Sequence, residues 1–196
     1  MNSKNSVKTK KLVLLAILTA IIVVLQTVSA FIRPGFFPIT LSLTPIVVGA
    51  ALCGAGAGAF LGLVFSVMVL IDPATMAFLS FSFIGTVITV VLKGVLAGLA
   101  AGLVFRLLEK KNRYIAALCA GIVSPIVNTG IFFLGCLVFF GDFILPDGNG
   151  NLIYIILTAY IGVNFFIELA VNTALSGVIT MLVMAGRKIL RLDSRG

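Results

Sequence analysis

The chain contains no histidine and no tryptophan, and only 10% of its 196 residues are charged. Without histidine, histidine-based intramembrane proteases and most metal-centred membrane enzymes are excluded. The sequence also has no nucleotide-binding loop of the form G-x-x-x-x-G-K-[ST]. Its three cysteines stand apart without C-x-x-C spacing, which predicts neither a zinc site nor a disulfide framework. We therefore predict a protein that is not an enzyme and that uses no cofactor and no metal.

Apolar residues dominate what is present. They make up 61% of the chain and form runs long enough to cross the ~30 Å hydrocarbon core of a bilayer. The sequence therefore predicts an all-α integral membrane protein, with residues 1–196 as a single transmembrane domain. The first run, about residues 11–31, is too long for the apolar part of a signal peptide and is predicted to remain as the first helix.

Positive charge lies mainly in three clusters. Twelve of the fourteen Lys and Arg residues fall within residues 4–11, 106–113 and 187–195. Basic flanks of membrane spans stay in the cytoplasm during insertion, so both termini and the middle of the chain are predicted to be cytoplasmic. The net charge of +8 is then explained by contact with lipid headgroups, and no nucleic-acid partner is predicted.

Six transmembrane helices satisfy this charge pattern. The run 39–71 would be about 50 Å long as one helix, so we divide it at the Gly54–Gly58 stretch, which is predicted to turn in the cytoplasm. The remaining spans are predicted at about 77–108, 114–140 and 152–185. Arg33, Asp72, Asp142 and Asp147 then lie on the outer side. A single tilted helix over 39–71 would give five spans and would place the termini on opposite sides.

Two ionisable residues, Lys93 and Glu168, fall inside predicted spans, where a charge is costly and by default indicates function. Both lie at similar depth, so a buried ion pair between them is possible. Polar residues recur at every fourth position around Glu168, at Tyr160, Asn164, Asn172 and Ser176, and the preceding span carries Ser124, Asn128 and Thr129. These residues hold helices together or line a polar pocket in the outer half. In the pocket interpretation, Tyr160 and Asn164 are the better ligand candidates, whereas Asn172 and Ser176 are structural.

Other residues admit two interpretations each. Arg33, in the first outer loop, either closes a pocket over an anionic or aromatic ligand or anchors to lipid headgroups. Small residues at four-residue spacing let helices approach closely in lipid. Ala16 and Ala20 show this spacing on the first helix, and Gly94, Gly98 and Gly102 repeat it on the fourth, where packing inside the protein is the favoured interpretation.

Together these features resemble the substrate-binding S component of an energy-coupling factor (ECF) vitamin transporter. The resemblance rests on the size, the six spans, and three segments: Lys11 to Ala20, Pro38 to Ala50, and Gly62 to Phe65. In that family an alanine-x-x-x-alanine step on the first helix docks against a transmembrane coupling (T) subunit, and Ala16 and Ala20 match it. The resemblance further implies a multi-pass protein of a prokaryotic cell membrane with two cytoplasmic ATPase partners.

The resemblance also implies a mechanism. The protein would bind a water-soluble vitamin tightly at the outer face, topple on the coupling subunit and release the vitamin inward. The residues placed where ligands bind are Arg33, Lys93, Asn128, Tyr160, Asn164 and Glu168. The Thr-Pro-Ile block and the segment Ser124 to Gly130 look most similar to pantothenate-type members, with riboflavin, folate and cobalamin as alternatives. A gradient-driven secondary transporter that uses Lys93 and Glu168 as a relay, or a purely structural membrane subunit, would be the rival functions.

Overall fold

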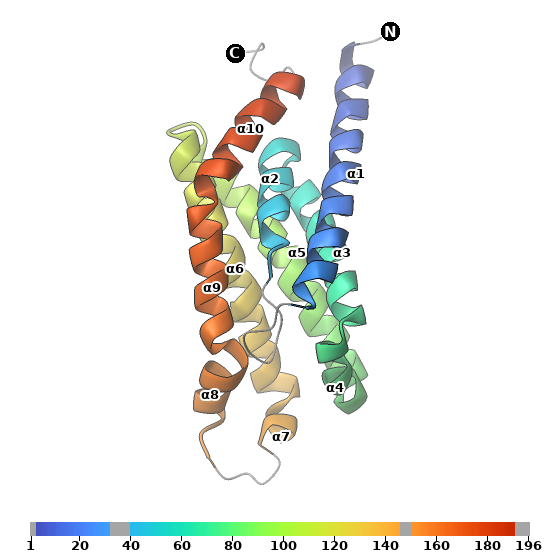
Figure 1. The fold of residues 1–196 in the computed structure, drawn as a ribbon, viewed down its shortest axis with the longest axis vertical. Coiled ribbons are helices and arrows are strands. Elements are labelled where there is room, and N and C mark those ends of the chain that lie inside the picture. The colour runs from blue at the N-terminus through green and yellow to red at the C-terminus, as the bar shows by residue number, and fades with distance from the viewer. Residues whose placement is uncertain (1–2, 32–39, 146–149, 191–196) are drawn as a thin grey trace.

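The computed structural model describes residues 3–31, 40–145 and 150–190, and every regular element within these ranges is a helix. Figure 1 shows the helices packed side by side into an elongated bundle. In chain order they are α1 (Ser3–Ser29), α2 (Leu43–Cys53), α3 (Ala55–Ile71), α4 (Pro73–Phe81), α5 (Phe83–Leu108), α6 (Arg113–Phe139), α7 (Gly141–Ile144), α8 (Leu152–Ile155), the π-helix η1 (Ile156–Ile161), α9 (Gly162–Ala174) and α10 (Ser176–Leu190).

The described helices provide between three and five membrane spans by length and composition. Segments of α1, α5 and α6 are each long and apolar enough to cross a bilayer. Two bent pairs add one span each if both halves belong to it: α3 with α4, bent by 82°, and Leu152–Ile161 with Phe165–Ala174, bent by 48°. The eleven residues of α2 extend only about 16 Å, so the count of six spans stays a prediction.

The ends of the described chain lie together. Helix α1 begins, and α10 ends, at the same end of the bundle, opposite α4, α7 and α8 (Figure 1). An ion pair between Glu109, just after α5, and Arg187 of α10 fastens the turn between α5 and α6 to this end. The basic clusters around residues 106–113 and 187 are therefore neighbours, as the charge pattern predicts. Their cytoplasmic orientation remains a prediction.

The predicted turn in the long apolar run is confirmed at Gly54. Its φ of 101° lies in the region where L residues are strained and glycine is not, and the chain reverses there between α2 and α3. Two further glycines of the same run lie inside α3 and serve a different purpose. A Cβ on Gly58 would lie 2.3 Å from the carbonyl oxygen of Gly98, and one on Gly62 would lie 2.0 Å from that of Gly94.

The glycine series of α5 therefore packs inside the protein, which confirms the favoured interpretation of its spacing. Backbone meets backbone along the contact between α3 and α5, which lets lipid-embedded helices approach closely. A large core adjoins this contact on the side of the termini and includes Ile46, Leu61 and Phe105. A smaller, aromatic core lies around Phe78 and Phe140.

Two helices predicted as continuous are broken. The predicted helix 77–108 divides at Ser82, whose hydroxyl accepts a hydrogen bond from the N–H of Gly85 and so starts α5 as a new helix. The predicted helix 152–185 is interrupted by η1 and again at Leu175. The interruption at η1 and the break between α3 and α4 at Asp72 both lie beside the site described below.

Candidate ligand-binding cavity

A cavity of about 590 Å³, its mouth included, lies within the bundle. The lining residues come from α1, the segment before α2, the helices α3 to α6, η1 and α9, and they adjoin both cores. They are Gln26, Thr40, Phe65, Val69, Asp72, Thr75, Lys93, Asn128, Thr129, Phe132, Tyr160, Ile161, Phe165 and Glu168.

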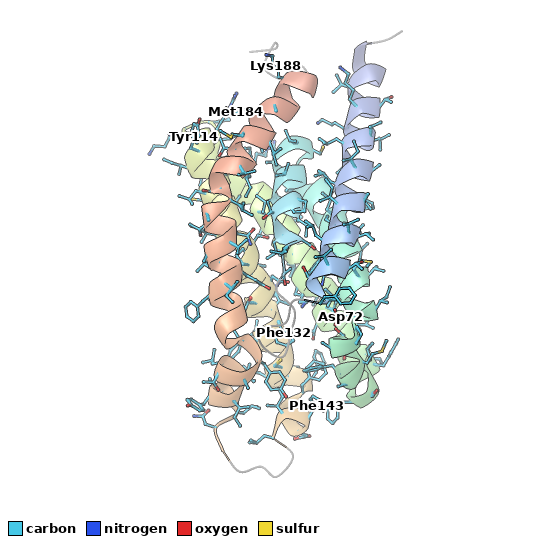
Figure 2. The ribbon with its side chains drawn as sticks, in the orientation of Figure 1. Asp72, Tyr114, Phe132, Phe143, Met184 and Lys188 are labelled. Atoms are coloured by element: carbon cyan, nitrogen blue, oxygen red, sulfur yellow. The ribbon has the colours of Figure 1, made fainter. Side chains whose placement is uncertain are left out.

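Four of the six residues predicted to bind substrate meet in this cavity: Lys93, Asn128, Tyr160 and Glu168. Arg33 lies outside the described residues. Asn164 belongs to α9, but its side chain is not among those described. Figure 2 shows the level of the cavity through Asp72 and Phe132, between the end that carries Lys188 and the end that carries Phe143.

Lys93 provides the only positive charge among the described lining residues. Its Nζ lies 5.9 Å from the centre of the Phe65 ring and 5.3 Å from that of Phe132. Such cation–π contacts contribute about 0.5–2 kcal/mol each, which offsets only part of the cost of burying an ammonium group. Within the described chain, Lys93 has no carboxylate oxygen within 4.0 Å. Its ammonium group therefore forms no ion pair with a described residue.

The possible Lys93–Glu168 ion pair is therefore not formed. The Glu168 carboxylate instead faces the segment before α2, where its Oε1 accepts a hydrogen bond of 3.0 Å from the backbone N–H of Thr40. The two charges still border the same cavity and interact across it. Glu168 is 5% exposed, so the cavity supplies nearly all the space that its carboxylate can reach.

The polar face of α9 is used largely for packing. Asn172 donates a hydrogen bond of 2.9 Å from its Nδ2 to the carbonyl of Glu168, and its Oδ1 accepts one of 3.2 Å from the Thr44 hydroxyl. Both groups of the Asn172 side chain are thus paired inside the protein. The structural interpretation of Asn172 agrees with these contacts.

Asp72 corrects a sequence expectation. The charge pattern places it on the outer side, whereas it is 6% exposed and lines the cavity. Its Oδ1 accepts a hydrogen bond of 2.8 Å from the N–H of Ala74, because Asp72 caps α4 and Pro73 occupies the first helical position. The 82° bend between α3 and α4 then leaves this cap beside the cavity rather than at the surface.

Other lining residues were not selected from the sequence. Gln26 is the clearest case, since it is a polar residue within an otherwise apolar part of the first helix, and that isolation was a usable signal. Thr40 and Thr75 gave no such signal, because hydroxyl residues are common near helix ends. The aromatic residues Phe65, Phe132 and Phe165 could not be distinguished from the chain's other phenylalanines without the fold.

Asn128 combines burial with an unmet hydrogen bond. It is 4% exposed, lines the cavity, and its Oδ1 has no partner among the described residues. A buried polar atom without a partner costs about 1–3 kcal/mol, which a hydrogen bond from a ligand would recover. Tyr160 stands nearby, with its ring 6.0 Å from that of Phe78 at an interplanar angle of 86°. This edge contact anchors the Tyr160 ring to the aromatic core.

These elements can bind a small polar molecule with a negative group. The described residues include no cluster of three or more His, Cys, Asp and Glu that would hold a metal ion. What the cavity offers is one ammonium group, two carboxylates already bonded to backbone N–H groups, a buried amide, and aromatic walls.

Bundle and cavity together define a helical membrane protein with an internal site for a small solute. The chain belongs to the family described as "ECF transporter, substrate-specific component", whose model matches residues 10–184. The comparison with curated proteins and the comparison with solved structures gave no match. The family is one of transporter substrate-binding components, not of enzymes, and its multi-pass membrane character agrees with the apolar helices described above.

Proposed function

We propose that this protein binds a water-soluble vitamin in the cavity described above and delivers it inward as the S component of an ECF importer. The observation that carries the proposal is the ammonium of Lys93, which has no carboxylate partner among the described residues, in a cavity that also holds the unsatisfied Oδ1 of Asn128. Burying a charged group inside a membrane bundle is costly unless a group of opposite charge lies beside it. A ligand carboxylate would pair with Lys93, and this pairing would offset the cost of burying the ammonium group and the carboxylate.

Pantothenate is the substrate that we propose first. It carries one carboxylate for Lys93, and its amide and hydroxyl groups match the hydrogen-bonding capacity of Asn128 and Tyr160. The described lining residues contain a single cation, Lys93, which can pair with one ligand carboxylate, whereas Asp72 and Glu168 would repel a second one. Folate, with two carboxylates, fits that balance less well, and riboflavin and cobalamin remain alternatives. Arg33 and Asn164 are proposed as additional contacts.

We further propose that α1 docks on a transmembrane coupling subunit that is driven by two cytoplasmic ATPases. Leu18 and Ile22 are buried against the protein, whereas Ala16 and Ala20 lie on the exposed face of the same helix. A small-residue step on an exposed helix face allows another helix to pack closely. In this proposal the bundle topples on that contact, so that the cavity opens first outward and then inward.

The test is to identify the ligand directly. Native mass spectrometry of protein purified from rich medium should show a bound mass equal to that of a vitamin. Titration with pantothenate, riboflavin, folate and cobalamin should then show tight binding of one of them without any ion gradient. Uptake into liposomes should require the ATPase module. Uptake by the protein alone that stops with an ionophore would instead support a gradient-driven carrier.

A further inference from the structure

The segment from Thr40 to Thr44 begins at the cavity, which Thr40 lines, and alternates hydroxyl residues with leucines. Its hydroxyl residues Thr40, Ser42 and Thr44 all make hydrogen bonds to other helices, whereas Leu43 is fully buried in the large core. We call these three residues and their partners the clasp. Its bonds connect positions 16 and 128 residues apart in the sequence.

The clasp bonds to two different helices. Ser42 donates a hydrogen bond of 3.1 Å from its hydroxyl to Oε1 of Gln26 on α1. Thr40 donates a hydrogen bond of 3.0 Å from its backbone N–H to Oε1 of Glu168 on α9. The segment before α2 thus joins α1 and α9. Gln26, Thr40 and Glu168 all line the cavity, so the joined residues are themselves part of the ligand site.

From this geometry we infer that Glu168 is a positioning residue of the clasp and not a contact for the charge of the ligand. The inference rests on the proposed function and deepens it. The Glu168 carboxylate accepts a hydrogen bond from the backbone N–H of Thr40, and its negative charge would repel a ligand carboxylate paired with Lys93. Its contribution to binding is therefore the placement of an acceptor that fixes the start of α2 against α9.

Two conservative variants separate placement from charge. Glu168→Gln keeps an oxygen acceptor at the same reach and removes the charge, whereas Glu168→Asp keeps the charge and withdraws the acceptor by one methylene group. If Glu168 positions Thr40, the Asp variant should bind the vitamin roughly 5- to 150-fold more weakly, the range for an unsatisfied buried donor. The Gln variant should bind within about threefold of wild type or more tightly. A charge contact with the ligand predicts the opposite order.

The experiment measures the dissociation constant and dissociation rate of radiolabelled pantothenate, or of whichever of the four vitamins the wild type binds, in detergent. Ser124→Ala is the matched control, because Ser124 is a fully buried polar residue without a bonded hydroxyl and does not line the cavity. Its affinity should equal that of wild type. Elution profiles and thermal midpoints show whether each variant is folded.

The outcomes separate the inference from the function on which it rests. Weaker, faster-dissociating binding by the Asp variant alone supports the clasp. Equal loss in both variants, or a greater loss in the Gln variant, would show that the ligand is held by the charge of Glu168, and the inference would be wrong while vitamin binding stands. No change in either variant would also overturn it. If the wild type binds none of the four vitamins, the proposed function fails, and the inference fails with it.

Discussion

Replacing Gly62 by alanine should destabilise the bundle, because no space exists for one more carbon atom. A Cβ at this position would lie 2.0 Å from the carbonyl oxygen of Gly94 and 2.6 Å from its carbonyl carbon. Both atoms belong to the backbone, so no side chain can rotate away. Ordinary van der Waals contact begins at 3.4 Å. To bring the Cβ–oxygen distance from 2.0 Å to that value, α3 and α5 must separate by about 1.4 Å at this level.

The magnitude follows from two opposing effects. Alanine in place of a helical glycine favours the helix by about 0.5–1 kcal/mol, whereas overpacking a well-packed interior costs about 1–3 kcal/mol. Gly130 is the control, since it lies in α6 and a Cβ there meets no atom within 4 Å. Gly130→Ala should therefore gain only the stabilisation of about 0.5–1 kcal/mol that comes from alanine's higher helix propensity. Because both variants gain the same helix propensity, they should differ by the overpacking cost alone, about 1–3 kcal/mol in the free energy of unfolding.

Thermal unfolding in detergent can be followed with a thiol-reactive dye. The chain lacks tryptophan, but Cys136 is fully buried and becomes reactive only when the bundle opens. For a domain of this size, the thermal midpoint is expected to shift by about 2–4 °C for each kcal/mol of stability. The midpoint of Gly62→Ala should therefore fall below that of Gly130→Ala by several degrees. Equal midpoints would show that α3 and α5 are not in backbone contact, and the reasoning would be refuted.

Three further predictions concern charge and docking. Lys93→Gln should weaken pantothenate binding by roughly 10- to 150-fold, because a charge-assisted hydrogen bond contributes about 1.5–3 kcal/mol. The same variant should leave the affinity for the uncharged analogue pantothenol nearly unchanged. Calorimetric titration of both compounds measures the two affinities. Glu109→Gln should lower the thermal midpoint by a few degrees through loss of its ion pair with Arg187, with a smaller effect in high salt. Ala16→Trp should abolish copurification with the coupling module and preserve vitamin binding. The control Val138→Trp, at a position that is 71% exposed on α6, should preserve both. If the Ala16→Trp variant still copurifies with the module, the docking assignment is wrong.

Helical periodicity and the cost of intramembrane charge predicted much of this molecule. Both depend on local sequence, so they identify an all-helical membrane protein, the turn at Gly54, and the glycine contact of α5. They also selected Lys93, Asn128, Tyr160 and Glu168, which the fold brings into one cavity. Whether these residues bind a vitamin stays a prediction.

Long-range geometry explains what the sequence did not reveal. The direction of the Glu168 side chain is decided by the N–H of Thr40, which lies 128 residues away. No periodicity in α9 contains that information, so an ion pair with Lys93 looked equally plausible. Asp72 was placed outside because charges were assigned by loop position, whereas a bend of 82° follows it and leaves it buried.

The positions of the helix breaks argue that the cavity shaped the fold. In a bilayer, backbone that leaves the helical pattern must be satisfied by protein or must line a cavity. Two breaks in the described chain meet this condition at the site: Asp72 caps α4 and lines the cavity, and η1 carries Tyr160 and Ile161 into it. The contact between α3 and α5, where glycines pack backbone against backbone, is regular helix over its whole length. The regular pair of α3 and α5 therefore supports one wall and carries Lys93, and the two breaks add Asp72 and Tyr160 to the site.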